Sequence, residues 1–362
     1  MSEKPLSPPG LVSAPPPARP PASLSGLPAP PPGLPPPPMT PVSMPPLPPG
    51  LPLPPGLPPP PAMPSFGAPA PSPLQLDAPM QAAVRKLDAV VVDCVRRTRT
   101  CTSIYLFVGD PGPYRAGQFL SIDPHQFPEL AHWVAFLEDK KAKVELPRAY
   151  SLQSAPGEKC LSICVEAEDY DPKRGAWPPL LSPFLAYSAL KGRELVVTGI
   201  TGSYFLSDDV DQHTDQVVHV VGGAGVVPSY SIVKDELKNG RHPRVRHTVI
   251  TQHKNLADSV LRDQLEALAR AYPDRLQLVP LLSDEDVAGS QRGQVSVELL
   301  RKHVRDPGTA RVFASGASVT RHEQRLAREQ GLEPAPRFLE SVTAMLDELG
   351  VPREHLKREA FG

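Results

Sequence analysis

The sequence predicts an antiparallel β barrel followed by a doubly wound parallel-sheet α/β domain, both preceded by a disordered proline-rich segment. Three observations predict this architecture. About 33 of the 51 prolines lie in residues 1–80, short strand-like runs separated by turn residues follow, and after about residue 210 strand-like runs alternate with helical ones. We expect three parts: a disordered segment at 1–80, a barrel domain at 82–208 and an α/β domain at 209–362.

The proline-rich segment carries almost no charge, since Arg19 is the only charged side chain between Lys4 and Asp77. Proline lacks the amide donor that helices and sheets need, and recurring Pro-Pro-Gly-Leu units place a glycine in each stiff run, so we expect polyproline II character. The segment would be either a ligand for a proline-recognition module or a linker without a specific partner. Pro-x-x-Pro spacings arise automatically in such a composition, which favours the linker.

The bulk composition excludes several classes of protein. A formal net charge of -1 gives no field that would attract nucleic acid or an anionic membrane. Four cysteines are few for a disulfide scaffold, and we find no signal-peptide core or membrane-length apolar run. We therefore expect a soluble, reduced, cytoplasmic protein. Without a Cys-x4-Cys-x2-Cys run or a helical pair of histidines, we expect no metal site.

The barrel is predicted from short runs rich in β-branched and aromatic residues, bounded by Gly, Pro and Asp. These runs lie at 87–94, 103–108, 117–122, 148–151, 160–165 and 194–198. Between the third and fourth runs, apolar residues at 130, 133, 134 and 137 have helical spacing, which predicts a helical insertion at 127–141. A second short helix is expected at 178–185.

The α/β domain is predicted from four strand–helix pairs. The strands are expected at 217–221, 246–251, 276–281 and 311–314, and the helices that follow them at 229–238, 259–271, 295–303 and 320–330. This alternation is typical of a parallel sheet covered by helices. A further helix is expected at 337–349.

Two stretches carry chemistry. Arg148-Ala149-Tyr150-Ser151 offers a cation, an aromatic face and a hydroxyl, which suit a flat, electron-rich ring with an anionic tail. Later, the Gly-rich stretch 222–225 follows a hydrophobic strand and precedes a helix, so its amides can approach a pyrophosphate. An exposed strand and an ordinary strand–turn–helix are the plainer interpretations. The two stretches in this order are more informative than either alone.

The order of barrel, Arg-x-Tyr-Ser strand, Ser-Pro-Phe-Leu helix, Gly-rich loop, Ser-Gly turn and terminal Glu-x-Phe resembles the ferredoxin–NADP reductase family of FAD enzymes. The resemblance covers about residues 82–362 and implies an FAD-binding barrel followed by an NAD(P)-binding α/β domain. This sequence has Pro179 at a glycine position, Ala224 at a Thr or Ser position, and Ser315 where the family has a cysteine beside the nicotinamide. The insertion at 127–141 and the helix at 337–349 are not typical of the family.

The resemblance also implies the site residues. Arg148 would bind FAD phosphate, Tyr150 would pack on the isoalloxazine and Ser151 would reach the ring near N5. The other expected FAD contacts are Ser182 and Phe361. The expected NAD(P) contacts are Gly222, Gly223, Ala224, Gly225, Pro228 and Gly316. The candidate catalytic residues are Ser151, Ser315 and Glu359.

The implied function is that of a flavoprotein reductase that takes hydride from NAD(P)H and passes single electrons to a separate protein acceptor, such as a ferredoxin or an oxygenase component. Two alternatives stay open: a non-catalytic scaffold on a decayed reductase fold, with a partner-recruiting proline-rich tail, and a flavin-dependent reductase of small molecules. The segment 251–255 has neither an arginine pair for a 2′-phosphate nor an acidic residue for a free ribose. NADH and NADPH are therefore not distinguished; Lys254 would suit NADPH, and NADH is slightly favoured.

Overall fold

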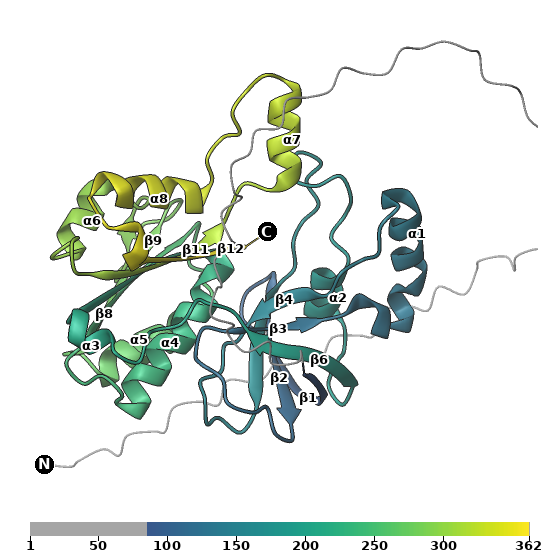
Figure 1. Ribbon diagram of the computed structural model, residues 1–362, viewed down its shortest axis with the longest axis horizontal. Coiled ribbons are helices and arrows are strands. Elements are labelled where there is room, and N and C mark those ends of the chain that lie inside the picture. The colour runs from purple at the N-terminus through teal and green to yellow at the C-terminus, as the bar shows by residue number, and fades with distance from the viewer. Residues whose placement is uncertain (1–84, 362) are drawn as a thin grey trace, which may run out of the picture. The chain divides into compact units, whose positions relative to one another are not determined.

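The computed structural model describes residues 85–361, which contain two six-stranded sheets (Figure 1). The predicted proline-rich segment at 1–80 lies outside these residues. The elements of the first sheet and its helices are β1 (Lys86–Arg96), β2 (Cys101–Val108), β3 (Phe119–Ile122), α1 (Ala131–Lys141), β4 (Arg148–Ser151), β5 (Leu161–Glu166), α2 (Leu181–Tyr187) and β6 (Glu194–Thr201). Those of the second are α3 (Val210–His213), β7 (Gln216–Gly222), α4 (Val226–Asn239), β8 (Arg246–His253), α5 (Arg262–Ala271), β9 (Leu276–Leu282), β10 (Gln291–Arg292), α6 (Val297–His303), β11 (Arg311–Ala317), α7 (Arg321–Glu329), α8 (Phe338–Glu348) and β12 (Leu356–Phe361).

The first sheet is antiparallel and closes on itself. Its strand order is β4-β3-β6-β1-β2-β5. Just beyond β4, Leu152 forms an antiparallel bridge with Ile163 of β5, and the amide of Gln153 donates to the carbonyl of Ser162 at 2.7 Å. These bonds join the two outer strands, so the sheet forms a barrel without free edges there.

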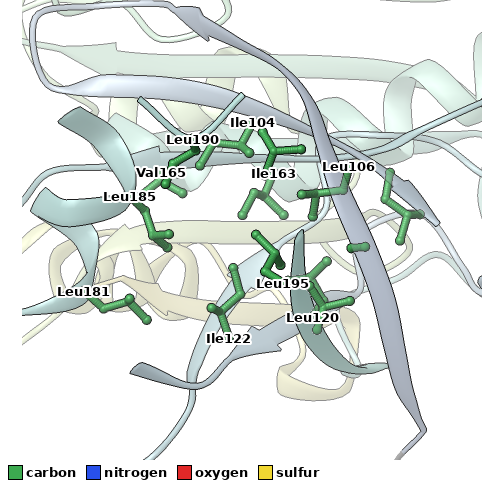
Figure 2. Close-up of a cluster of buried hydrophobic side chains, with 14 of the residues drawn as sticks. Ile104, Leu106, Leu120, Ile122, Ile163, Val165, Leu181, Leu185, Leu190 and Leu195 are labelled. Atoms are coloured by element: carbon green, nitrogen blue, oxygen red, sulfur yellow. The ribbon is translucent and has the colours of Figure 1, made fainter. Parts of the chain in front are cut away.

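Inward-facing aliphatic side chains fill the barrel (Figure 2). Because successive side chains of a strand point to opposite faces, Ile104 and Leu106 of β2 both enter this core. Leu181 and Leu185 of α2 cover one end of it. Burial stabilises the fold by about 1.5–3 kcal/mol for each such side chain.

The predicted helical insertion is present as α1, between β3 and β4. Its Val134 and Leu137 are buried, whereas Trp133 is 60% exposed and Phe136 41% exposed. The apolar spacing thus located the helix, but only part of the apolar face packs on the barrel.

The second sheet is parallel, with strand order β10-β9-β8-β7-β11-β12. The chain proceeds outward from β7 to β9, returns, and continues from β11 to β12 on the other side of β7. Ligands of such sheets bind beyond the carboxyl ends of the strands, at the point where the strand order reverses. Gly222 ends β7 and Ala317 ends β11, so the predicted dinucleotide residues flank this point.

Two features near the C-terminus differ from the expectation. The helix at 337–349, expected as an atypical addition, is α8; its Leu339, Val342 and Leu346 are buried against the sheet, and it connects the parallel strands β11 and β12. Among the α-helices of residues 85–361, it is α7 that has no buried residue. The sequence does not predict strand β12, because half of its residues are charged.

The predicted fold class, an antiparallel barrel followed by a doubly wound α/β domain, is confirmed. Strand β6 ends at Thr201 and β7 begins at Gln216; the domain limits 82–208 and 209–362 stay predictions. Within residues 85–361, no helix is long and apolar enough to cross a membrane, and no three His, Cys, Asp or Glu side chains are grouped as a metal ion requires.

Candidate active site

The site is built where the end of β4 meets β12. The hydroxyl of Ser151, at the end of β4, donates to Oε1 of Glu359 at 2.5 Å, although 208 positions separate the two residues. Pairing with β11 places Glu359 beside Ser315. Two of the predicted catalytic residues, Ser151 and Glu359, are therefore in direct contact, and the third is one strand away.

Glu359 has an altered acidity. Burial raises its pKa to about 7, and the hydrogen bond from Ser151 partly opposes that increase. The carboxyl is thus divided between its neutral and ionised forms near neutral pH. Such a group can either hold or release a proton, which is what acid–base chemistry near pH 7 needs.

Arg148 and Tyr150 lie on one face of β4, because residues two apart share a face. The ring of Tyr150 is partly buried against the barrel core, and burial raises the pKa of its hydroxyl, so the phenol stays neutral. The Arg148 side chain is 55% exposed, and its Nη2 donates to Oε2 of Glu145 at 2.8 Å. A cation and a neutral aromatic face are therefore presented together.

The Gly-rich loop after β7 is a tight turn. Gly223 has φ +56°, a left-handed conformation that favours glycine. A Cβ at Gly225 would lie 2.5 Å from the carbonyl carbon of Ser315, so no larger residue fits there. The first residues of α4, including Pro228 at its third position, follow directly, and no side chain caps this helix start. The loop and helix start can therefore approach a pyrophosphate closely.

Ser315 lies beneath this loop, fully buried. Its hydroxyl donates to the carbonyl of Gly225 at 2.5 Å and lies 3.1 Å from the hydroxyl of Tyr204, which in turn lies 2.9 Å from Oγ of Ser229. These contacts give Ser315 a structural part, in which it joins β11 to the Gly-rich loop. Its catalytic role stays a prediction.

Phe338, the first residue of α8, lies against two of the predicted glycines. A Cβ at Gly222 would lie 3.0 Å from its ring, and a Cβ at Gly316 would lie 2.5 Å from it. Gly316 also has φ +156°. The ring therefore holds the ends of β7 and β11 together at the point where the strand order reverses.

An acidic side chain from the barrel lies near the loop. Glu166 ends β5, and its Oε2 lies 4.0 Å from a Cβ placed on Gly223. Burial raises the pKa of Glu166, and the nearby amide of Ala224 partly opposes that increase. The loop is therefore bordered by a carboxyl group from the barrel.

The remaining predicted contacts lie at the ends of their elements. Ser182 is the second residue of α2 and is partly buried. Phe361 ends β12, beside Ala317, and its carbonyl accepts from the amide of Ser318 at 3.2 Å. The roles of Ser182 and Phe361 toward FAD stay predictions.

Sequence reasoning missed Glu145, Glu166, Tyr204 and Phe338. An acidic residue three positions before Arg148 was a usable signal for Glu145. Glu166 and Phe338 had no local signal, since their contacts come from other segments.

The residues present fit both expected cofactors. For FAD, the barrel offers the exposed guanidinium of Arg148, the face of Tyr150 and the hydroxyl of Ser151, which is hydrogen-bonded to Glu359 of β12. For a dinucleotide, the loop at 222–225 offers glycines that permit close backbone approach, followed by the uncapped start of α4. This geometry suits one class of protein, an oxidoreductase that would bind a flavin on its barrel and a nicotinamide dinucleotide on its parallel sheet.

Comparison with known proteins supports this class. Residues 220–320 match the family model of the oxidoreductase NAD-binding domain. The chain is 25% identical over 299 residues to one component of the Na(+)-translocating NADH-quinone reductase of Neisseria meningitidis, and the match covers 77% of this chain and 69% of that component. It is 27% identical over 105 residues to an NADH nitrate reductase of Volvox carteri, and that match covers 28% of this chain and 12% of that enzyme.

Solved structures show the same fold. The FAD/NAD-binding domain of the nitric oxide dioxygenase of Vibrio cholerae matches with a TM-score of 0.56 and 18% identity, over 76% of this chain and 98% of that one. A cytochrome P450 reductase of Amycolatopsis matches with a TM-score of 0.56 and 19% identity, over 77% of this chain and 70% of that one. Together these matches confirm an oxidoreductase NAD-binding domain within a fold shared with solved FAD/NAD-binding domains and reductases, as the sequence predicts.

Proposed function

We propose that this chain takes hydride from NAD(P)H and delivers electrons to a separate redox protein. The hydrogen bond between Ser151 and Glu359 carries the proposal. It joins β4, the proposed flavin strand, to β12 of the parallel sheet, at the end of that sheet where ligands of such sheets bind. A fold retained only as a scaffold would not need a carboxyl with a pKa near 7 at that point.

The residues of β4 and Glu359 of β12 would have distinct parts. Bound FAD supplies the redox chemistry, since it accepts two electrons together and releases them singly. Arg148 would bind its phosphate, and the face of Tyr150 would support its ring. When Glu359 carries a proton it can donate to Oγ of Ser151, which leaves the Ser151 hydrogen for the ring edge.

The α/β domain would orient the dinucleotide. The amides of 222–225 and the start of α4 would bind the pyrophosphate. Gly316 would contact the dinucleotide through its backbone at the end of β11, and Pro228 fixes the first turn of α4. Beyond β8, the carboxylate of Glu285 accepts from the amide of Leu256 at 2.9 Å. This places an acidic group beside the loop where NADH and NADPH are distinguished, which favours NADH.

The acceptor is proposed from chemistry, because a fold does not specify it. Three of the four proteins named above are reductases, of a quinone, of nitrate and of a cytochrome P450, and the fourth belongs to a nitric oxide dioxygenase. Electrons that leave a flavin singly suit a one-electron protein carrier, such as a ferredoxin or an oxygenase component.

Anaerobic stopped-flow mixing of the FAD-loaded protein with NADH, and separately with NADPH, tests the proposal. We expect rapid loss of the flavin absorbance at about 450 nm, faster with NADH. Bound flavin that neither dinucleotide bleaches would indicate a scaffold instead. Turnover with a small quinone but with no ferredoxin would indicate a reductase of small molecules.

A paired substitution tests the flavin strand. Arg148→Ala with Tyr150→Ala should release FAD and leave the secondary structure seen by circular dichroism unchanged. The control is Arg96→Ala with Tyr187→Ala, which removes a cation–π pair elsewhere in the same part of the chain, with Cζ of Arg96 4.9 Å from the centroid of the Tyr187 ring. If the first variant keeps its flavin, this stretch is not the FAD site.

A further inference from the structure

Glu145, in the connection between α1 and β4, is a buried carboxylate. Its side chain is 5% exposed. One oxygen accepts from Nη2 of Arg148 at 2.8 Å, and the other accepts from Nζ of Lys141. Burying one carboxylate is costly unless it is paired. Because an unpaired carboxylate would be costly in this buried position, Glu145 is held in its hydrogen bond to Arg148.

The insertion holds Glu145 in place. The amide of Glu145 donates to Oε1 of Glu138, in α1, at 2.8 Å. The same oxygen lies 2.9 Å from Nε2 of His125, whose Nδ1 lies 2.6 Å from Oδ1 of Asp123 just after β3. A chain of hydrogen bonds thus runs from the end of β3 through α1 to the residue that pairs with Arg148.

Arg148 remains available to a ligand. Its side chain is 55% exposed, and among the hydrogen bonds of residues 85–361 its guanidinium uses Nη2 alone. An arginine on a strand samples many rotamers and loses that freedom when it binds phosphate. Held by Glu145, it can present its other nitrogens at a lower entropic cost. Lys141 balances the charge of Glu145, so the three side chains together remain cationic.

We propose that Glu145 is a positioning residue for the flavin phosphate, and that the insertion carrying α1 serves to hold it. Glu145 fixes the guanidinium of Arg148 and does not touch the cofactor itself. This inference rests on the proposed FAD site.

Titration of the FAD-free protein with FAD and with riboflavin, followed by flavin fluorescence, tests the inference. Glu145→Gln should weaken FAD binding about tenfold and change the affinity for riboflavin, which has no phosphate, by less than about twofold. Arg148→Ala should weaken FAD binding at least as much. The double variant should bind FAD no more weakly than Arg148→Ala alone, because Glu145 acts through Arg148.

A matched control is Glu129→Gln. It removes the carboxylate of an exposed pair on the same insertion, whose oxygen lies 2.7 Å from Nη1 of Arg193, and it should leave both affinities unchanged. Failure of the wild-type protein to bind FAD would overturn the proposed function. If the wild type binds FAD, three outcomes overturn the positioning role alone. Glu145→Gln could keep its affinity for FAD, or it could lose affinity for FAD and riboflavin equally. The third outcome is a double variant whose loss of FAD affinity is the product of the losses in the two single variants.

Discussion

Replacing Glu359 with glutamine should change how the stability of the FAD-free protein depends on pH. Burial raises the pKa of Glu359 from its ordinary value of 4.5 to about 7. The folded chain therefore binds this proton more strongly than the unfolded chain does. The resulting stabilisation is complete below about pH 4.5 and is lost as the pH rises through about 7. At 1.36 kcal/mol per pH unit the difference is about 3 kcal/mol, and partial solvent exposure lowers it to about 2–3 kcal/mol.

Urea unfolding followed by circular dichroism measures this effect. Glu359→Gln is neutral at every pH, so its free energy of unfolding relative to wild type should rise by about 2–3 kcal/mol from pH 4.5 to pH 8. Because the wild type and Glu359→Gln are compared at each pH, the contributions of all other titrating groups cancel. Ser151→Ala removes the bond that lowers the pKa of Glu359 and should steepen the pH dependence of the wild type. Parallel curves for Glu359→Gln and wild type would refute the reasoning.

Three other changes give measurable outcomes. Gly225→Ala should lower the melting temperature and weaken NADH binding, because its Cβ would lie 2.5 Å from the carbonyl carbon of Ser315; a variant equal to wild type in both would contradict the tight turn. Burial lowers the pKa of His219 to about 3 and that of its neighbour His247 well below 6.5. The contribution of these neutral histidines to folding stability is therefore complete above about pH 6.5 and decreases as the pH falls below that value. Phenylalanine binds no proton, so between pH 7 and 4.5 the free energy of unfolding of His219→Phe in urea should decrease by about 2–3 kcal/mol less than that of wild type. An equal decrease would count against the buried neutral pair. Glu166→Gln should tighten NADH binding about threefold in a fluorescence titration, since it removes an anion from the loop; weaker binding would show that the carboxylate assists the dinucleotide.

The sequence predicted those parts of the fold that have a local period. Barrel strands alternate, and the α/β domain alternates strand with helix, so both could be recognised from short windows. β12 could not, because the run Leu356–Phe361 becomes a strand only by pairing with β11. Likewise α7 and α8 both have helical patterns, and only their contacts show that α8 packs on the sheet.

Prediction of the site from the sequence is also limited to what contiguous motifs encode. The residue types on β4 indicated a ring and a phosphate, and the glycines indicated a pyrophosphate, because each motif is contiguous. The contact between Ser151 and Glu359 depends on two sheets, and no local pattern encodes it. The position of Tyr204 beneath the Gly-rich loop needs three segments at once.

The structure also shows what connects the Gly-rich loop to the segment that follows β4. Helix α4 starts at the Gly-rich loop and extends back over the residues that follow Ser151. Its Ser231 hydroxyl donates to the carbonyl of Ser154 at 2.7 Å, and its Lys234 amine donates to the carbonyl of Gln153 at 3.0 Å. Both donors are buried, so breaking either bond would leave a polar group unpaired in the interior. The helix that would receive the pyrophosphate is therefore tied to the segment that follows the proposed flavin strand, and packing within the fold would set the distance between the two cofactors.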